Sequence, residues 1–302
     1  MTAASGALVG VDVGGTKIAV GVVDTEGRVQ GRARGATPPA AEIPAAVAAL
    51  VAEAAQGEPV AAVGIGAAGF VASDRRTVLT ASNIGWSDAP VAAQVEELVG
   101  APVVVENDAN AAAWGEYRFG AGAGSRHVLM VTVGTGVGGG VVLDGQLRRG
   151  AHGVAAEVGH VRFERDGLLC GCGQRGCLEQ YASGTALVRR AREAGLVDLD
   201  GPEITRRALV GDRTARRVLA DLGADLGEGL ASLVAVLDPD VVVVGGGVAA
   251  AGDHLLDAVR LSLARHLTGG EERPGPVVRA ALLGNDAGLV GAADLAGAHG
   301  DA

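Results

Sequence analysis

Two glycine-rich stretches, each lying between two apolar runs, limit most strongly how this chain folds. In the first half, residues 8–13 and 17–23 flank a Gly-Gly pair, and in the second half residues 127–133 and 141–143 flank the stretch 134–140. Short runs rich in Val and Ile that meet at glycines are typical of β-hairpins. Glycine also lets backbone N–H groups approach an anion without a Cβ in the way. Each half therefore predicts a hairpin whose turn can hold a phosphate.

Helical patterns separate these strands along the chain. We expect helices at residues 40–55, 91–99, 109–117, 182–194, 204–209, 214–237, 248–267 and 287–296, and further strands at 28–34, 60–65, 102–105 and 241–244. Alternating strands and helices indicate the α/β class. A length of 302 residues suggests two domains. One hairpin in each half predicts two similar domains facing a cleft, although no long repeat is evident.

Charge and composition exclude several classes of protein. The 25 basic and 35 acidic residues give a net charge of −10, which disfavours nucleic acid or a membrane surface as the main partner. The apolar stretch 241–252 is shorter than the roughly 20 residues of a membrane span. No targeting segment is evident at residues 1–11. The three cysteines are clustered and odd in number, which favours a cytoplasmic compartment over a secreted disulfide framework.

The first turn carries charged and polar groups as well as glycine. Asp12-Val-Gly14-Gly15-Thr16-Lys17 places a carboxylate, a hydroxyl and the only lysine of the chain around one turn. A Walker-type phosphate loop is excluded because it needs Lys directly before Ser or Thr. The plainer alternatives are a simple tight hairpin, and a lysine that is isolated only because of codon bias.

The later glycine motifs do not predict a dehydrogenase. Gly134, Gly136 and Gly139 match the spacing of a dinucleotide fingerprint, but another strand follows instead of the required helix. Gly245-Gly246-Gly247 does lie between a strand and a helix, yet only about 50 residues remain after it. A dehydrogenase is therefore a weak alternative.

One histidine and three cysteines have the composition of a metal site. The pattern is His160-x9-Cys170-x-Cys172-x4-Cys177. Four such ligands complete a tetrahedral zinc site and leave no open position, so the zinc would be structural. The alternative is three reduced thiols packed in a loop.

Asp108 is the candidate general base. It follows a strand and opens a helix in Glu106-Asn107-Asp108. A carboxylate beside a hydroxyl can orient it and accept its proton. The alternative is that Asn107 or Asp108 only caps the helix. Glu157 and His160, three residues apart, would by spacing alone lie on one exposed helix face.

Together these motifs resemble the ROK family of the actin/hexokinase/heat-shock-chaperone ATPase superfamily. Residues 12–17 look like its first phosphate loop, residues 133–138 like the second, and residues 243–248 like the adenosine motif. Their order, together with the cysteine signature, makes the resemblance specific. It extends from Asp12 to about Ala292. Within the family, the chain is most similar to bacterial ATP-dependent kinases of glucose.

The resemblance implies a fold and an activity. The fold is a two-domain actin-like ATPase (ribonuclease H-like) fold with a cleft between the domains. The small domain would contain residues 1–108 plus a C-terminal helix at about 289–302, and the large domain would contain residues 109–288 with the zinc loop. The activity is phosphorylation of glucose to glucose 6-phosphate by ATP, the first step of glycolysis. Family members occur as dimers and tetramers, so a homo-oligomer is expected.

The resemblance also assigns site residues. Asp108 is the expected catalytic base, and Asp12 would help hold Mg²⁺, through water because Mg²⁺ usually keeps several waters. The glucose contacts implied are Asn83, Asn107, Asp108, Glu157, His160 and Glu179. The ATP contacts implied are Asp12, Gly14, Gly15, Thr16, Lys17, Gly134, Thr135, Gly136, Gly138, Gly245, Gly246 and Gly247. The zinc ligands implied are His160, Cys170, Cys172 and Cys177.

Alternative functions remain open at this point. Another hexose, such as mannose, fructose or an N-acetylated hexosamine, competes with glucose as the substrate. A sugar-responsive repressor of the same family would carry a DNA-binding domain ahead of the first loop, where only eleven residues precede Asp12. A non-catalytic sugar-sensing regulator would be expected to lack the base, whereas Asp108 is present.

Overall fold

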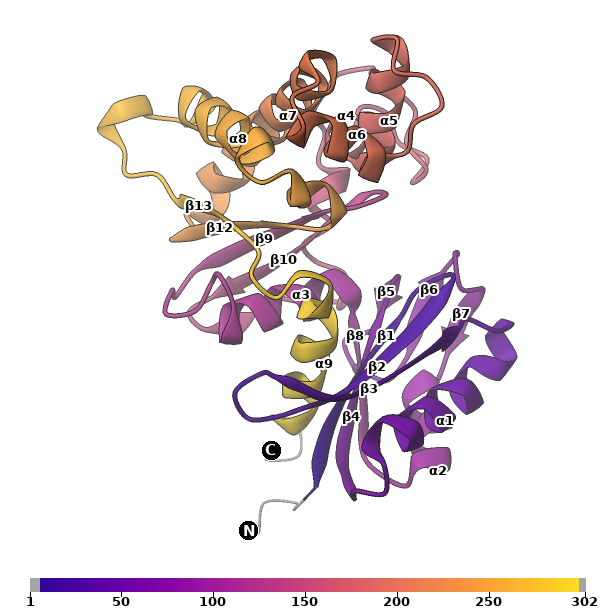
Figure 1. Cartoon of the computed structure of the whole chain (residues 1–302). Helices are drawn as coiled ribbons and strands as arrows, with labels where there is room; N and C mark the ends of the chain where they lie inside the picture. Colours follow the sequence, from indigo (N-terminus) through magenta and orange to yellow (C-terminus); the bar gives the residue numbers. More distant parts are fainter. Residues whose placement is uncertain (1–5, 299–302) are drawn as a thin grey trace. The chain divides into compact units, whose positions relative to one another are not determined.

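The computed structural model describes residues 6–298, which form two compact α/β units (Figure 1). Unit 1 contains residues 6–124, 147–156 and 285–298. Unit 2 contains residues 125–146 and 157–284. Residues 1–5 and 299–302, which belong to the expected small domain and its C-terminal helix, lie outside the described residues.

Unit 1 is built on a mixed five-stranded sheet in the order β3-β2-β1-β4-β8. Its strands are β1 (Ala7–Val13), β2 (Lys17–Val23), β3 (Val29–Ala36), β4 (Val60–Ala67) and β8 (Val103–Asn107). The first three strands are antiparallel, whereas β4 and β8 run parallel to β1. The expected hairpin is therefore β1–β2, and the carboxyl ends of β1, β4 and β8 meet at one edge of the sheet.

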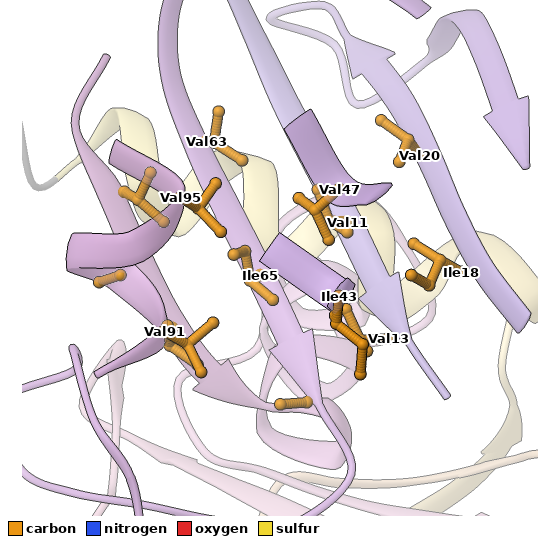
Figure 2. Close-up of a cluster of buried hydrophobic side chains, with 14 of the residues drawn as sticks. Val11, Val13, Ile18, Val20, Ile43, Val47, Val63, Ile65, Val91 and Val95 are labelled. Atoms are coloured by element: carbon orange, nitrogen blue, oxygen red, sulfur yellow. The ribbon is translucent and has the colours of Figure 1, made fainter. Parts of the chain in front are cut away.

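Helices cover both faces of this sheet. The short η1 (Ala40–Glu42), α1 (Ile43–Ala55) and α2 (Val91–Val99) cover one face. Figure 2 shows the aliphatic core that joins α1 and α2 to the sheet, in which Val11, Ile65, Ile43 and Val95 are buried. On the other face lie α3 (Asp108–Phe119) and α9 (Ala287–Gly297), with η5 (Gly284–Asp286) just before α9.

Unit 2 repeats the same plan. Its sheet has the order β11-β10-β9-β12-β13, made of β9 (Val128–Val133), β10 (Val137–Leu143), β11 (Gln146–Leu147), β12 (Val241–Gly245) and β13 (Val277–Ala280). As in unit 1, a hairpin (β9–β10) is extended by a strand parallel to its first member (β12). The similarity of the two halves, expected from their glycine stretches, is present in the strand order.

The helices of unit 2 lie between β11 and β13 in the sequence. They are η2 (Val158–His160), α4 (Glu179–Ala182), α5 (Gly184–Glu193), α6 (Gly201–Leu209), α7 (Arg213–Leu237), η3 (Gly247–Ala251), α8 (Asp253–His266) and η4 (Gly270–Glu272). The long α7 packs along α8 and also contacts α4, α5 and α6. The expected α/β class is confirmed. No helix among residues 6–298 combines the length and apolar character needed to cross a bilayer.

Some elements differ from those expected. The edge strand β13 was not expected from the sequence, nor was a three-stranded sheet of β5 (Phe70–Val71), β6 (Val78–Ala81) and β7 (Trp86–Ala89). The boundary between the small and the large domain was expected at residue 108, which would place β8 and α3 in different domains. In the structure α3 packs against α9, so unit 1 continues to Gly124. Unit 1 also includes the segment 147–156, which lies within the range expected for the large domain.

Two glycines let α9 approach the sheet backbone directly. A Cβ added to Gly10 in β1 would lie 1.9 Å from the carbonyl oxygen of Leu289, and one added to Gly64 in β4 would lie 1.8 Å from that of Ala292. Neither position has room for a methyl group, because the opposing atoms are backbone. These glycines therefore seat the C-terminal helix on strands from the start of the chain.

We expect Gly64→Ala to lower the free energy of unfolding by about 1–3 kcal/mol or more, because the methyl group forces α9 away from the sheet. Gly35→Ala is the matched control in the same sheet. Its Cβ would lie 3.6 Å from a Leu50 methyl, an ordinary contact. Urea unfolding of both variants is the measurement, and equal stability of the two variants would contradict the close approach.

Candidate active site and metal centre

The first glycine turn connects β1 to β2 in unit 1. Gly14 N–H donates to the Lys17 carbonyl at 3.0 Å, and the Thr37 hydroxyl donates to the Gly14 carbonyl at 2.7 Å. A Cβ on Gly15 would lie 3.1 Å from the backbone oxygen of Asn83. The structure thus brings Asn83 beside this turn. Lys17 is exposed.

Asp12 stands just before this turn, at the end of β1. Burial raises the pKa of its carboxyl above the ordinary value of 3.8, and the positive charge of Lys17 opposes that rise. A carboxylate held partly out of water near a glycine turn is typical of functional sites, where a bound cation can compensate the charge. Asp12 therefore has the chemistry expected of a group that helps hold Mg²⁺.

Asn107 and Asp108 lie where β8 passes into α3. Asn107 caps the helix, because its Oδ1 accepts from Asn110 N–H at 3.0 Å, and its Nδ2 donates to the Gly69 carbonyl at 3.1 Å. Asp108 begins the helix and is half-buried, with Oδ1 accepting from Ala109 N–H at 2.8 Å. The capping role considered for either residue thus belongs to the Asn107 side chain.

The second glycine turn connects β9 to β10 in unit 2 and rests on α5. The Gly134 carbonyl accepts from Gly184 N–H at 2.7 Å, and the Thr135 carbonyl accepts from the Thr185 hydroxyl at 2.8 Å. These bonds hold the turn against the first residues of α5.

A pocket of about 700 Å³ opens beside this turn. It is lined by Gly134, Thr135, Gly184, Thr185, Val188, Arg189, Arg192, Gly201, Pro202, Thr205, Gly247 and Val248. The second turn and Gly247, far apart in the sequence, therefore line one pocket. Arg189 and Arg192 were not among the expected site residues. Their three-residue spacing on an amphipathic helix was the available signal.

The expected metal ligands are brought together in unit 2. One ligand atom from each of His160, Cys170, Cys172 and Cys177 lies within 4.8 Å of the others. The Cys172 and Cys177 sulfurs are 3.6 Å apart, and the Cys170 sulfur is 3.7 Å from His160 Nδ1. A tetrahedral zinc with Zn–S bonds of about 2.3 Å requires sulfurs about 3.8 Å apart, so these residues fit zinc.

Two of the three thiols of this cluster are harder to ionise than a free thiol. Burial raises the pKa of Cys170 and raises that of Cys177 to about 12, whereas a hydrogen bond from the Gln174 backbone lowers the pKa of Cys172. Zinc binds the thiolate, so binding would release protons from these groups.

Glu157 and Glu179 lie next to the metal ligands. The Nε2 atom of His160 is 3.9 Å from a Glu157 oxygen, on the opposite side of the ring from the nitrogen that faces Cys170. Burial raises the pKa of Glu157; the charge of His160 opposes this rise, and that of Glu179 adds to it. Both carboxylates and the free side of the imidazole therefore offer hydrogen bonds to a polar ligand.

Glu179 also contacts the second glycine turn, which the sequence analysis did not anticipate. Its Oε2 accepts from Val137 N–H at 3.0 Å, and a Cβ on Gly136 would lie 2.3 Å from the same oxygen. Its Oε1 is 3.7 Å from the Cys170 sulfur. One carboxylate thus joins the cysteine loop to the turn, and Gly136 is needed for it to fit.

These features define the class of protein. Two α/β units with the same strand order, each with a glycine hairpin, are the actin-like fold of sugar kinases. Residues 8–299 match the model of the ROK family. The chain belongs to the ROK family.

Individual relatives are similar over almost the whole chain. A glucokinase of Streptomyces coelicolor is 50% identical, over 96% of this chain and 98% of that protein. The crystal structure of a ROK family glucokinase from Streptomyces griseus in complex with glucose and AMPPNP is 52% identical, with a TM-score of 0.89 over 96% of this chain and 99% of that one. An N-acetylmannosamine kinase of Yersinia pestis is 36% identical, over 94% of this chain and 96% of that protein.

We expect Asp12→Asn to make the protein more stable at neutral pH when Mg²⁺ and nucleotide are absent. Because the folded-state pKa of Asp12 lies above 3.8, the folded chain binds this proton more tightly than the unfolded chain does. The Asp12 contribution to stability therefore falls as the pH rises from 3.8 through the folded-state pKa. Thermal unfolding at several pH values is the measurement.

The stabilisation should be largest at neutral pH and should shrink as the pH falls toward 3.8. Asp88→Asn is the control, because this aspartate is exposed. A gain that is independent of pH, or equal in the control, would contradict the burial of the Asp12 charge.

Proposed function

We propose that this chain transfers the γ-phosphoryl group of ATP to glucose, giving glucose 6-phosphate and ADP. The observation that carries the proposal is the 52% identity, over 96% of the chain, with the Streptomyces griseus glucokinase whose structure holds glucose and AMPPNP. The two glycine turns and the Asn107–Asp108 turn are the local features that support it.

Asp108 is the proposed base. A sugar primary hydroxyl is a poor nucleophile, and the Asp108 carboxylate can orient it and accept its proton. The oxygen–phosphorus bond to glucose forms as the bond to ADP breaks. The proton leaves late in such a transfer, so the position of Asp108 matters as much as its basicity. The position of Asp108 in the first turn of α3, directly after the Asn107 cap, supports this role.

The glycine turns are the proposed phosphate sites. Backbone N–H groups at Gly15, Thr16, Thr135 and Gly136 would bind phosphate oxygens, with Lys17 adding positive charge. Gly14, Gly134 and Gly138 would shape the two turns, since the Gly14 and Gly134 N–H groups donate to the carbonyls of Lys17 and Gly136. The pocket bounded by Gly247 would take the nucleoside, beside Gly245 and Gly246. Asp12 would hold Mg²⁺ through water, and the ion would neutralise charge on the phosphates.

The proposed glucose contacts are Asn83, Asn107, Asp108, Glu157, His160 and Glu179. Amides and carboxylates can read sugar hydroxyls because an analogue that lacks a hydroxyl leaves a polar group unpaired. The likeness to an N-acetylmannosamine kinase makes that sugar the second candidate. A panel of glucose, mannose, fructose and N-acetylmannosamine, with ADP formation as the readout, separates the candidates, and a preference for a sugar other than glucose would overturn the first one.

We further propose that His160, Cys170, Cys172 and Cys177 hold a structural zinc. The sulfur and nitrogen distances support this, and the four ligands leave no position for water activation. With Nδ1 turned toward the cysteines, Nε2 of His160 is free to meet the sugar. A cytoplasmic location stays a prediction from the cysteine usage. A role at the start of glycolysis and a dimeric or tetrameric assembly stay predictions of the family resemblance.

We expect Asp108→Asn to lower kcat by roughly 100-fold or more, because the amide keeps the shape of the side chain but cannot accept the proton. Glucose binding should survive, since the amide still offers hydrogen bonds. Steady-state kinetics and calorimetric glucose titration are the measurements. Asp88→Asn, at an exposed aspartate, is the matched control. An Asp108→Asn variant that keeps more than about a tenth of wild-type kcat would exclude Asp108 as the base.

We expect Cys172→Ala to lose the zinc, to unfold at a lower temperature and to raise the KM for glucose on the order of tenfold, because the metal orients His160. The KM for ATP should change less. Metal analysis and kinetics are the measurements, and His254→Ala, at a histidine outside the cluster, should keep the zinc. Purified wild type without zinc, or a zinc-free variant with normal glucose affinity, would refute the proposal.

A further inference from the structure

A buried carboxylate that has no role in the proposed chemistry lies two residues before Asp108. Glu106, in β8, is 2% exposed. One of its oxygens, Oε2, accepts from Arg149 Nε at 2.5 Å and lies 3.8 Å from Arg75 Nε. Burying a carboxylate is costly unless it is paired and hydrogen-bonded. Glu106 is therefore held by specific partners on two other segments of unit 1.

The other oxygen of Glu106 binds the turn that carries the proposed base. Oε1 accepts from Asn107 N–H and from Asn110 Nδ2, both at 3.1 Å. Asn107 in turn caps the helix through Asn110 N–H. Asp108 thus lies between two residues that bind the same carboxylate.

The segment that supplies Arg149 is itself fixed in unit 1. The Arg149 carbonyl accepts from Ala155 N–H at 3.0 Å, which closes the segment 147–156 into a loop. A Cβ on Gly153 would lie 2.4 Å from the Val71 carbonyl oxygen, so the loop packs directly on β5. Arg149 therefore reaches Glu106 from a supported position, with its guanidinium three-quarters buried.

Arg75 completes a group of two guanidiniums around one carboxylate. Its carbonyl accepts from Val105 N–H at 2.8 Å, which ties the β5–β6 turn to β8. Burial, and the like charge of Arg149, lower the pKa of Arg75, and Glu106 opposes that fall. Without the Glu106 charge, two half-buried cations would face each other.

We propose that Glu106 and Arg149 are positioning residues for the phosphoryl transfer, and that their ion pair fixes the direction in which the Asn107–Asp108 turn presents the Asp108 carboxylate. The inference rests on the proposed function of Asp108. A misplacement of about 1 Å at a reacting group can cost on the order of 100-fold in rate. Removing the pair should therefore impair turnover in a protein that remains folded.

Kinetics of Glu106→Gln, Arg149→Met and Arg149→Lys test the proposal. Glu106→Gln keeps an acceptor for Asn107 and Asn110 but loses the charge. Arg149→Met loses the cation and its hydrogen bond to Glu106 Oε2 but keeps a side chain of similar length. We expect kcat to fall about 10- to 100-fold and the KM for glucose to rise, with the KM for ATP within about twofold. Arg149→Lys, which restores the charge without the fork of donors, should recover part of kcat.

Arg76→Met is the matched control. It removes a bidentate pair with Glu96 in the same unit, next in sequence to Arg75, without touching the Asn107–Asp108 turn. All assays are run well below the unfolding temperature of every variant. A fall in kcat then reflects the position of Asp108 and not a loss of folded protein. Wild-type kcat in folded Arg149→Met, or an equal loss in Arg76→Met, would overturn the proposal. If Glu106→Gln does not fold, the two Arg149 variants decide.

Amide hydrogen exchange gives a readout independent of the substrate. Residues 109–112, in the first turns of α3, should exchange at least about tenfold faster in Arg149→Met than in wild type, and α2 should be unchanged. If the wild type does not phosphorylate glucose but these amides exchange faster in Arg149→Met, the proposed function is refuted. The inference that the ion pair holds the Asn107–Asp108 turn then still stands. If Arg149→Met shows unchanged amide exchange and a normal kcat for glucose, the positioning role of the ion pair is refuted and the proposed kinase activity stands.

Discussion

The direct contact of α9 with the backbone of β1 and β4 is the constraint on which unit 1 depends. Gly10 and Gly64 make it possible, because any side chain there would meet a carbonyl oxygen of the helix. On its other side α9 packs on α3 in the same manner, since a Cβ on Gly291 would lie 1.8 Å from the Ala111 carbonyl oxygen. The helix that begins with Asp108 is thus fixed by a segment almost 180 residues later in the chain. Backbone contacts of this kind leave little freedom, which suits a residue whose role is positional.

Charges held partly out of water recur among the candidate site residues of each unit and in the Arg75–Glu106–Arg149 group, and they carry a cost in stability. Burial raises the pKa of Asp12 and of Glu157, and it lowers that of Arg75. A protein selected for stability alone would have neutral groups at such positions, whereas binding a cation, a sugar hydroxyl or a phosphate needs charge where water is partly excluded. The Arg75–Glu106–Arg149 group offsets part of this cost by pairing opposite charges.

Unit 2 shows how a small loop without regular secondary structure can be ordered. The cysteine loop contains only the isolated bridges Arg162–Cys177 and Leu169–Arg175. Backbone hydrogen bonds, such as that from Cys170 N–H to the Gln174 carbonyl, hold its turns. The four candidate ligands cluster within it, and Glu179 reaches from the loop to the second glycine turn. The proposed metal site and the proposed phosphate turn, which are separate motifs in the sequence, are therefore joined by one side chain.

The sequence by itself determined the α/β class and the two glycine hairpins, and it pointed to the candidate base and the four candidate metal ligands, because each is encoded in a short stretch whose spacing has a direct chemical meaning. It missed β5–β7 and β13, which are strands of two to four residues with no sustained alternation. Only the tertiary structure decided that α3 belongs to unit 1, that the Glu179 carboxylate lies against Gly136, and that Arg149 pairs with Glu106. Gly136 and Glu179 are 43 residues apart in the sequence, and so are Glu106 and Arg149. The physical reason is that such contacts depend on which backbone segments can approach closely, and that depends on packing of the whole unit, which no local pattern of residues contains.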